Sequence, residues 1–223
     1  MKLLAIESAS EACSAALDLD GAIAERFEHA PRRHGELLPN WIDALVAEAG
    51  IKRTDLDAVA VSAGPGSFVS LRVGFGLAIG IAYGLDLPIH LVSSLAALAQ
   101  CAADGPDANI LAALDARMGE VYAGTYRVGS RGKVVAIGDP QLATPEAIEL
   151  PETGGGWVGV GNGFTAGDGE LSKSLGDRLA RIREGDWPRA GHVAALARDV
   201  EPVAAVEAQP VYLRERVAQP AGE

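Results

Sequence analysis

Cysteine and aromatic residues are scarce in this sequence. Of 223 residues, only Cys13 and Cys101 are cysteines, and Phe, Trp and Tyr together make up 5%. Two thiols so far apart form neither a CxxC pair nor a disulfide framework, which excludes a cysteine-based metal site and a disulfide-stapled scaffold. Cys13 lies within a predicted strand, so we expect it to pack as a small buried hydrophobe rather than react as a thiolate.

Positive charge is also in short supply. The chain has 30 acidic and 19 basic residues, a formal net charge of -11. Such a surface repels a phosphate backbone, so we do not expect this chain to bind nucleic acid by itself. Two small arginine clusters are interpreted as solvated surface: Arg178, Arg181 and Arg183 in one, and Arg214 and Arg216 in the other.

No long apolar run is present at the start of the chain. The first residues read MKLLAIES, and Glu7 interrupts the apolar stretch. This stretch is too short for a signal peptide or a membrane span. We therefore expect a cytoplasmic protein that does not enter a membrane.

The segment AVAVSAGPGSF at residues 58–68 predicts a buried strand, a glycine turn and the start of a helix. Ser67 stands where a helix N-cap belongs, and Gly64 and Gly66 would let backbone N–H groups approach an anion. However, no lysine lies between Gly64 and Gly84, so the phosphate-loop motif GxxxxGK[ST] is absent. The dinucleotide fingerprint fails as well. Packing and phosphate binding both stay open as roles for this turn.

The helix that follows has glycine at every fourth position of one face, at Gly76, Gly80 and Gly84. Each glycine in a helix costs about 1 kcal/mol relative to alanine, so this face needs a compensating close contact. Either the core of the domain or a partner helix would supply it. A neighbouring face is also made of small residues, namely Gly74, Ala78 and Ala82.

The spacing of apolar residues predicts a repeated unit. In the first copy we expect strands at residues 2–6, 12–19, 23–28, 58–62 and 89–92 and helices at 35–49, 67–84 and 94–103. After a linker at residues 104–107, the second copy has predicted strands at 110–114, 120–128, 133–137 and 157–160 and helices near 145–150 and 192–198. Glu7 and Asp115 each come at the end of the first strand of their copy.

This repeat predicts an α/β protein with the duplicated ribonuclease-H-like fold shared by actin, sugar kinases and Hsp70-type ATPases. We expect two lobes, residues 1–103 and 104–223, each with a mixed five-stranded sheet flanked by helices, the second lobe being reduced. In that fold a nucleotide lies between the lobes, although the fold alone does not grant that chemistry. The candidates for a vestigial nucleotide pocket are Glu7, Ser8, Gly64, Gly66, Ser67 and Asp115.

Three longer segments resemble the TsaB (YeaZ) family, a subunit of the machinery that makes threonylcarbamoyladenosine in bacterial tRNA. They are LAIESASEACSAAL at 4–17, AGPGSFVSLRVG at 63–74 and LDARMGEVYAGTY at 114–126, and the ending PVYLRERVA at 210–218 fits as well. The sequence departs from the family at Glu7, where Asp is usual, and at Val69 and Ser70, where Thr-Gly is usual.

The resemblance implies a subunit that is not catalytic on its own. Family members pair with the catalytic paralogue TsaD through helices of the N-terminal lobe, a TsaE-type ATPase joins the assembly, and tRNA is reached only through that complex. A homodimer is expected when the chain is alone. The implied partner surface consists of Leu37, Leu38, Trp41, Leu45, Arg72, Phe75, Gly76, Ile79, Gly80 and Tyr83.

The resemblance also allows a test for metal. TsaD holds its metal with an HxxxH pair on the first helix, but here His34 is followed four residues later by Leu38. His29 precedes Pro31 and therefore shares no helical register with His34. We expect no metal, no cofactor and no catalytic residue.

Two enzymatic alternatives are weighed against the subunit hypothesis. One is a stand-alone ATPase or kinase of the actin-like group, with its site at Glu7 and Asp115. The other is a protease of the glycoprotease type. For the protease, neither Ser67 nor Ser70 lies in a GxSxG nucleophile elbow, and the metal pair is broken.

Overall fold

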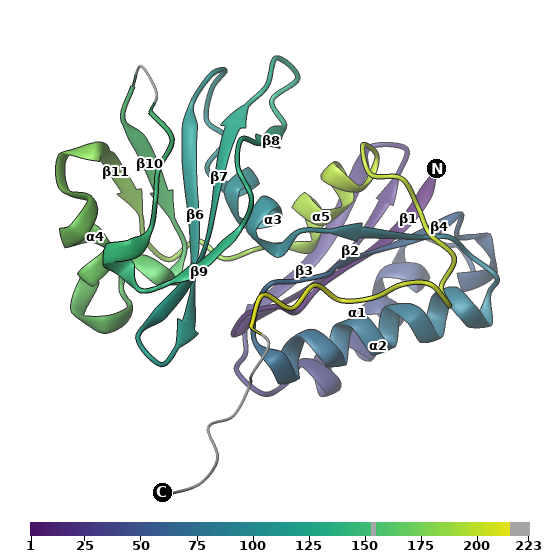
Figure 1. Ribbon diagram of the computed structural model, residues 1–223. Helices are drawn as coiled ribbons and strands as arrows, with labels where there is room; N and C mark the ends of the chain where they lie inside the picture. Colours follow the sequence, from purple (N-terminus) through teal and green to yellow (C-terminus); the bar gives the residue numbers. More distant parts are fainter. Residues whose placement is uncertain (153–154, 215–223) are drawn as a thin grey trace, which may run out of the picture.

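The computed structural model describes residues 1–152 and 155–214, and it contains two β-sheets, one in each half of the sequence (Figure 1). The strands of the first sheet lie in the order β3-β2-β1-β4-β5. β2 pairs antiparallel with β1 and β3, whereas β4 and β5 continue the sheet in parallel with β1. These strands, all predicted from the sequence, are β1 (Lys2–Glu7), β2 (Ala12–Leu19), β3 (Ala22–His29), β4 (Ala58–Ser62) and β5 (Ile89–Val92).

The second sheet repeats this order as β8-β7-β6-β10-β11. β10 and β11 run parallel to β6, as β4 and β5 do to β1, so the predicted duplication is confirmed. The expected count of five strands is wrong for this sheet, because β9 also pairs with β7 and makes six. The strands are β6 (Asn109–Arg117), β7 (Glu120–Val128), β8 (Val134–Ala136), β9 (Gln141–Ala143), β10 (Trp157–Val160) and β11 (Leu179–Arg183).

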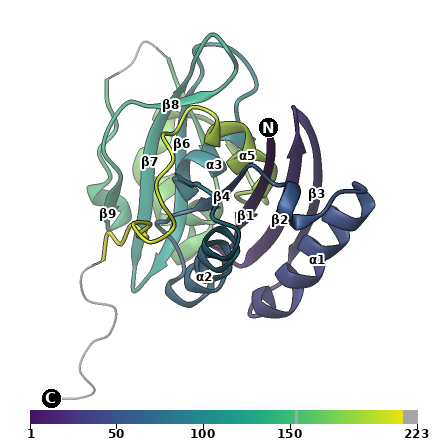
Figure 2. The same ribbon diagram turned by 90° about the vertical axis from the view of Figure 1, so that its right-hand side faces the viewer.

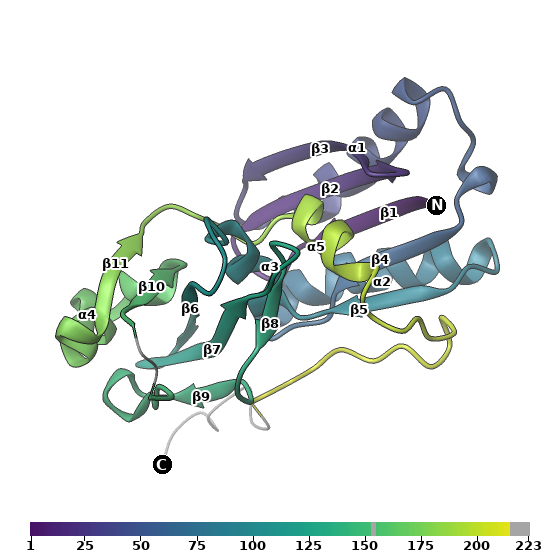
Figure 3. The same ribbon diagram turned by 90° about the horizontal axis from the view of Figure 1, so that it is seen from above.

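Helices cover both faces of the first sheet (Figures 2 and 3). Alternate side chains of a strand point to opposite faces, so Leu4 and Ile6 pack with α1 and α2, whereas Leu3 and Ala5 pack with α3 and α5. The helices are α1 (His34–Glu48), α2 (Phe68–Gly84), α3 (Ser94–Cys101), α4 (Glu170–Leu175) and α5 (Ala190–Ala197).

One of the hydrophobic clusters spans both lobes. A single cluster of buried side chains contains Leu3 of β1, Leu98 of α3, Leu114 of β6 and Val193 of α5. α3 and α5 thus fill the space between the sheets (Figure 1). The division into residues 1–103 and 104–223 stays a prediction, and α5, which follows that division in sequence, packs on the first sheet.

Within the described residues the second half has fewer helices than the first, and one expectation for it is wrong. The helix expected near residues 145–150 is a single 3-10 turn, Pro145–Ala147. The glycine-rich segment forms two more, Asn162–Phe164 and Ala166–Gly169, because Gly167 and Asp168 have φ values of 55° and 56° that interrupt a helix. The remaining 3-10 turns are Arg53–Asp55 and Gly176–Arg178. No helix within the described residues is long and apolar enough to cross a membrane.

After α5 the chain returns along the first sheet and ends beside the second. Val203 pairs with the edge strand β5 through two backbone hydrogen bonds to Ile89, of 2.9 and 3.0 Å. Farther on, the Val211 amide donates to the carbonyl of Ala63 at 2.6 Å. We call residues 210–214 the strap, since they run from the first lobe to the second.

Candidate functional site

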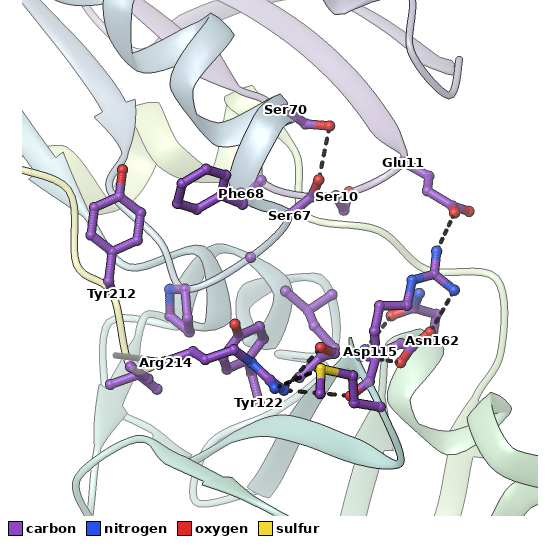
Figure 4. Close-up of a pocket in the computed structure, with 18 of the residues that line it drawn as sticks. Ser10, Glu11, Ser67, Phe68, Ser70, Asp115, Tyr122, Asn162, Tyr212 and Arg214 are labelled. Atoms are coloured by element: carbon purple, nitrogen blue, oxygen red, sulfur yellow. Dashed lines mark hydrogen bonds and ion pairs between the residues drawn. The ribbon is translucent and has the colours of Figure 1, made fainter. Parts of the chain in front are cut away.

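A cleft of about 390 Å³ lies between the two lobes (Figure 4). Its walls are the β1–β2 turn, the N-terminus of α2, the β6–β7 turn and the strap. Its volume falls in the range of small-molecule pockets. The polar and charged residues lining it include Ser10, Glu11, Ser67, Asp115, Arg117 and Asn162.

The glycine turn on the first-lobe side of the cleft is packed against other backbone. A Cβ on Gly66 would lie 2.1 Å from the carbonyl oxygen of Ala9, and the next amide, that of Ser67, donates to this oxygen at 2.7 Å. Gly64 donates its amide to Ser94 Oγ at 3.1 Å. These contacts explain the glycines by packing, and they occupy two of the amides that an anion would need.

Ser67 is the N-cap residue of α2 by position, as predicted, but its hydroxyl does not cap the helix. It donates instead to Ser70 Oγ at 3.1 Å. No histidine takes part in this contact, so the pair lacks the base that would activate a serine nucleophile.

The second lobe has an equivalent glycine turn, which sequence reasoning missed. Asn162, between Gly161 and Gly163, follows β10 as the first turn follows β4. Asn162 Oδ1 accepts a hydrogen bond of 3.0 Å from the Asp115 amide, and a Cβ on Gly163 would lie 2.8 Å from that of Ala113. The sequence pattern that could have predicted this turn is a polar residue with a glycine on each side, directly after a predicted strand.

An arginine bridges the cleft. Arg117 pairs with Asp115 at 2.9 Å and with Glu11 of the first lobe at 2.8 Å. The Arg117 amide also donates to Asp115 Oδ1 at 2.7 Å. Because the Arg117 side chain is 69% exposed, each ion pair contributes about 1 kcal/mol or less. The bridge nevertheless sets one positive charge between two carboxylates that line the cleft.

Glu7, in contrast, does not line the cleft. Its carboxyl is buried, Oε1 accepts a 2.6 Å hydrogen bond from the Ala9 amide, and Oε2 has no hydrogen-bond partner within the described residues. Burial raises the pKa of Glu7 to about 7, outweighing the hydrogen bond from the Ala9 amide, which lowers it. The lining of the cleft, which includes Asp115 but not Glu7, therefore does not support the alternative of a nucleotide site formed by both residues.

The remaining candidates of the nucleotide pocket serve the fold. Ser8 is buried, and its hydroxyl fills the place where Gly74 of α2 has no side chain. Gly64 lies under the strap, where a Cβ would be 2.5 Å from the carbonyl oxygen of Val211. With Glu7 outside the cleft and Asp115 paired to Arg117, these residues do not fit a magnesium-bound nucleotide, whose metal needs free carboxylate oxygens.

The histidines have structural partners. His34 is buried, and its Nε2 lies 3.1 Å from the carbonyl oxygens of both Ser10 and Ala12, so it donates to them. Nδ1 of His90 lies 2.7 Å from the carbonyl oxygen of Val200. Across the part of the chain that the structure describes, no three His, Cys, Asp or Glu side chains gather as metal ligands.

The exposed face of α2 is the second candidate site. A Cβ added to Gly76, Gly80 or Gly84 would meet no atom within 4 Å. A Cβ on Gly74 would instead lie 2.2 Å from Ser8 Oγ. The two small-residue faces of the helix therefore differ. The face with Gly74 packs on the first lobe, whereas the face with Gly76, Gly80 and Gly84, which was predicted to need a partner, has no contact at these glycines.

The structure narrows the predicted partner surface. Leu37, Leu38, Leu45 and Phe75 are at most 8% exposed and belong to the core of the first lobe, so they offer a partner little accessible surface. Trp41 and Ile79 are half-buried at the edge of that core. The positions left exposed are Arg72, Gly76, Gly80 and Tyr83.

Known proteins resemble this chain along nearly its whole length. The family model of TsaD, tRNA N6-adenosine threonylcarbamoyltransferase, matches residues 27–210. The tRNA threonylcarbamoyladenosine biosynthesis protein TsaB of Escherichia coli K12 is 37% identical over 227 residues, covering 98% of this chain and 96% of its own. The protein of the same name in Haemophilus influenzae is 34% identical and covers 97% of this chain and 95% of its own.

A solved structure agrees with the sequence matches. YeaZ from Pseudomonas aeruginosa superimposes with a TM-score of 0.87 at 34% identity, covering 95% of this chain and 99% of that one. This match and the strand order described above confirm the duplicated, actin-like fold. Since both sequence and structure match over almost full length, the chain belongs to the TsaB (YeaZ) family.

Proposed function

We propose that this chain is a non-catalytic subunit in tRNA threonylcarbamoyladenosine biosynthesis. It would bind a TsaD-type catalytic paralogue and support transfer of the threonylcarbamoyl group to N6 of the adenosine next to the anticodon. The observation that carries the proposal is the open glycine face of α2, at Gly76, Gly80 and Gly84. Three helix glycines without intramolecular contact cost stability, and a closely packed partner helix would offset that cost.

The relatives support the pathway part of the proposal. The curated proteins that match along almost the whole chain are named for biosynthesis of threonylcarbamoyladenosine in tRNA. The match to the TsaD family model supports a partner with a similar fold. Two related folds can meet through equivalent helices, as two identical copies would, so we also expect a homodimer when TsaD is absent.

The chemistry of the cleft supports a non-catalytic role. Asp115 and Glu11 are paired with Arg117, and Glu7 is buried away from the cleft. The Ser67 hydroxyl is bonded to another serine rather than to a base. These groups offer neither an activated nucleophile nor a metal-bound phosphate site. The observations disfavour the alternative of a stand-alone ATPase.

The net charge bears on how tRNA is reached. A chain with a formal net charge of -11 repels a polyanion. We therefore expect tRNA to contact this subunit only within the complex. A TsaE-type ATPase would supply the nucleotide hydrolysis that this chain does not perform. Because the proposed substrate is tRNA, we expect the complex to work in the cytoplasm.

The decisive experiment compares Gly80→Leu with Gly105→Leu. A Cβ at either glycine meets no atom within 4 Å, so both variants should fold, but only Gly80 lies on the proposed partner face. We expect Gly80→Leu to lose the complex with TsaD in size-exclusion chromatography and the transfer activity that depends on it. Gly105→Leu should keep both. Full transfer by TsaD and TsaE without this chain would contradict the proposal.

A further inference from the structure

The strap forms one wall of the cleft. It lies on a surface that we call its seat, which is formed by Ala63, Gly64 and Phe68 of the first lobe and by Ala116 and Glu120 of the second. Val211, Tyr212, Leu213 and Arg214 all line the cavity. In Figure 1 the strap passes from the first lobe toward the second, and in Figure 4 Tyr212 and Arg214 face the cleft. This segment is the C-terminal end of the described chain, and no function considered above uses it.

The first-lobe part of the seat depends on the absence of a side chain. A Cβ on Gly64 would lie 2.5 Å from the carbonyl oxygen of Val211, so glycine at this position leaves room for the strap backbone. The Val211 amide donates to Ala63 at 2.6 Å. The Tyr212 ring contacts that of Phe68, with centroids 5.9 Å apart.

The second-lobe part of the seat is built around Arg214. Its guanidinium donates to Glu120 at 2.6 Å and to the carbonyl oxygen of Ala116 at 3.1 Å. Only 13% of the Arg214 side chain is exposed, so the interpretation of this arginine as solvated surface is wrong. A largely buried charge with these acceptors is the strongest fixed point of the strap.

Between these fixed points the strap is weakly held. Val211 is 47% exposed, Tyr212 is 43% exposed, and Leu213 is partly buried against the hydrophobic cluster that joins the lobes, so the apolar contacts of these three strap residues come from partly buried side chains rather than from fully buried ones. The two lobes, in contrast, are joined by a continuous buried core that contains α3 and α5. Opening the cleft by moving one lobe would break that core, whereas lifting the strap would remove only the partly buried Leu213 from its edge.

We propose that the strap is a releasable wall of the cleft, held shut by Arg214. Release of Arg214 from Glu120 and Ala116 lets residues 210–214 leave the seat and opens the cavity, while the pairing of Val203 with β5 keeps the preceding chain in place. This motion belongs to the chain by itself and does not depend on the proposed partner.

Hydrogen exchange measured by mass spectrometry tests the proposal on the full chain. In the wild type, we expect the Val211 amide to exchange faster than the amides of β1. Its exchange should occur through a local opening of the strap, so its rate should not change at low urea concentrations. In Arg214→Ala we expect exchange of the strap to rise by about tenfold or more, with β1 and α5 unchanged. Arg178→Ala is the matched control, because Arg178 also donates to a carbonyl, that of Leu150 at 2.9 Å, but far from the strap in the sequence.

A thiol in the cleft gives a second readout. Ser10 lines the cavity and is 6% exposed, so Ser10→Cys places a largely covered thiol in the wall of the same cavity that the strap helps to form. Its reaction with DTNB should accelerate when Arg214→Ala is added, relative to the background from Cys13 and Cys101. Unchanged exchange and unchanged thiol reactivity in Arg214→Ala would overturn the proposal. A uniform increase that includes β1 would also overturn it, because the arginine would then serve global stability.

Discussion

Replacing Glu7 with glutamine should change how the stability of this protein depends on pH. Burial raises the pKa of Glu7 from 4.5 to about 7, so the folded chain holds a proton that the unfolded chain releases. The stabilisation is fully present below the unfolded pKa and is lost as pH rises through the folded pKa. Each pKa unit corresponds to 1.36 kcal/mol, so the total loss between pH 4.5 and pH 8 is about 3 kcal/mol.

Glutamine cannot ionise, and it keeps an oxygen that can accept the Ala9 amide, which donates to Glu7 at 2.6 Å. Its unfolding free energy should therefore lack this contribution. We expect Glu7→Gln to resemble the wild type near pH 4.5 and to be more stable by about 3 kcal/mol at pH 8. The difference between the two proteins removes the contributions of all other titrating groups.

Urea denaturation at pH 4.5, 6, 7 and 8 is the assay, with the midpoint and slope of each transition giving the unfolding free energy. Glu207→Gln, at an exposed glutamate, is the control and should run parallel to the wild type. A stability difference between wild type and Glu7→Gln that stays constant over this pH range would refute the reasoning. It would mean that Glu7 keeps one protonation state throughout.

Other substitutions test the packing described above. Gly74→Ala should lower the melting temperature, since its Cβ would lie 2.2 Å from a buried serine hydroxyl, whereas Gly76→Ala should gain about 1 kcal/mol because its Cβ meets nothing. Arg198→Ala should cost about 2 kcal/mol in chemical denaturation, because Asp18, only 1% exposed, loses its 2.7 Å partner. Arg117→Ala, at a 69% exposed side chain, should cost about 1 kcal/mol or less in the same experiment. An equal loss of stability in Arg198→Ala and Arg117→Ala would contradict the expectation that a buried ion pair is costlier to break than an exposed one.

The sequence predicted the fold well where the pattern was local and periodic. The buried strands, the helix with glycine at every fourth residue and the duplication are all present, because alternation and helical spacing reflect which face meets the core. It missed β9, α4 and β11, which are short. In β11, Arg181 and Arg183 resembled a surface cluster, but they extend from an edge strand and both pair with Asp104.

The site was harder to predict than the fold. Segments far apart in the sequence contribute side chains to the cleft, among them Glu11, Arg117, Asn162 and Arg214. No local sequence pattern predicts that these side chains lie close together. Glu7 shows the opposite error. Its place at the end of β1 was predicted correctly, but the side chain is buried and does not line the cleft, and strand position alone does not decide that.

The position of α5 has a consequence for biosynthesis. Domains usually fold as units while the ribosome is still extending the chain, N-terminal parts first. Here the face of the first sheet that contains Leu3 and Ala5 is covered in part by Val193 and its neighbours, which lie late in the chain. The strands of the first lobe are thus translated early, but this face of their sheet is covered completely only after α5 (Ala190–Ala197) has been synthesised.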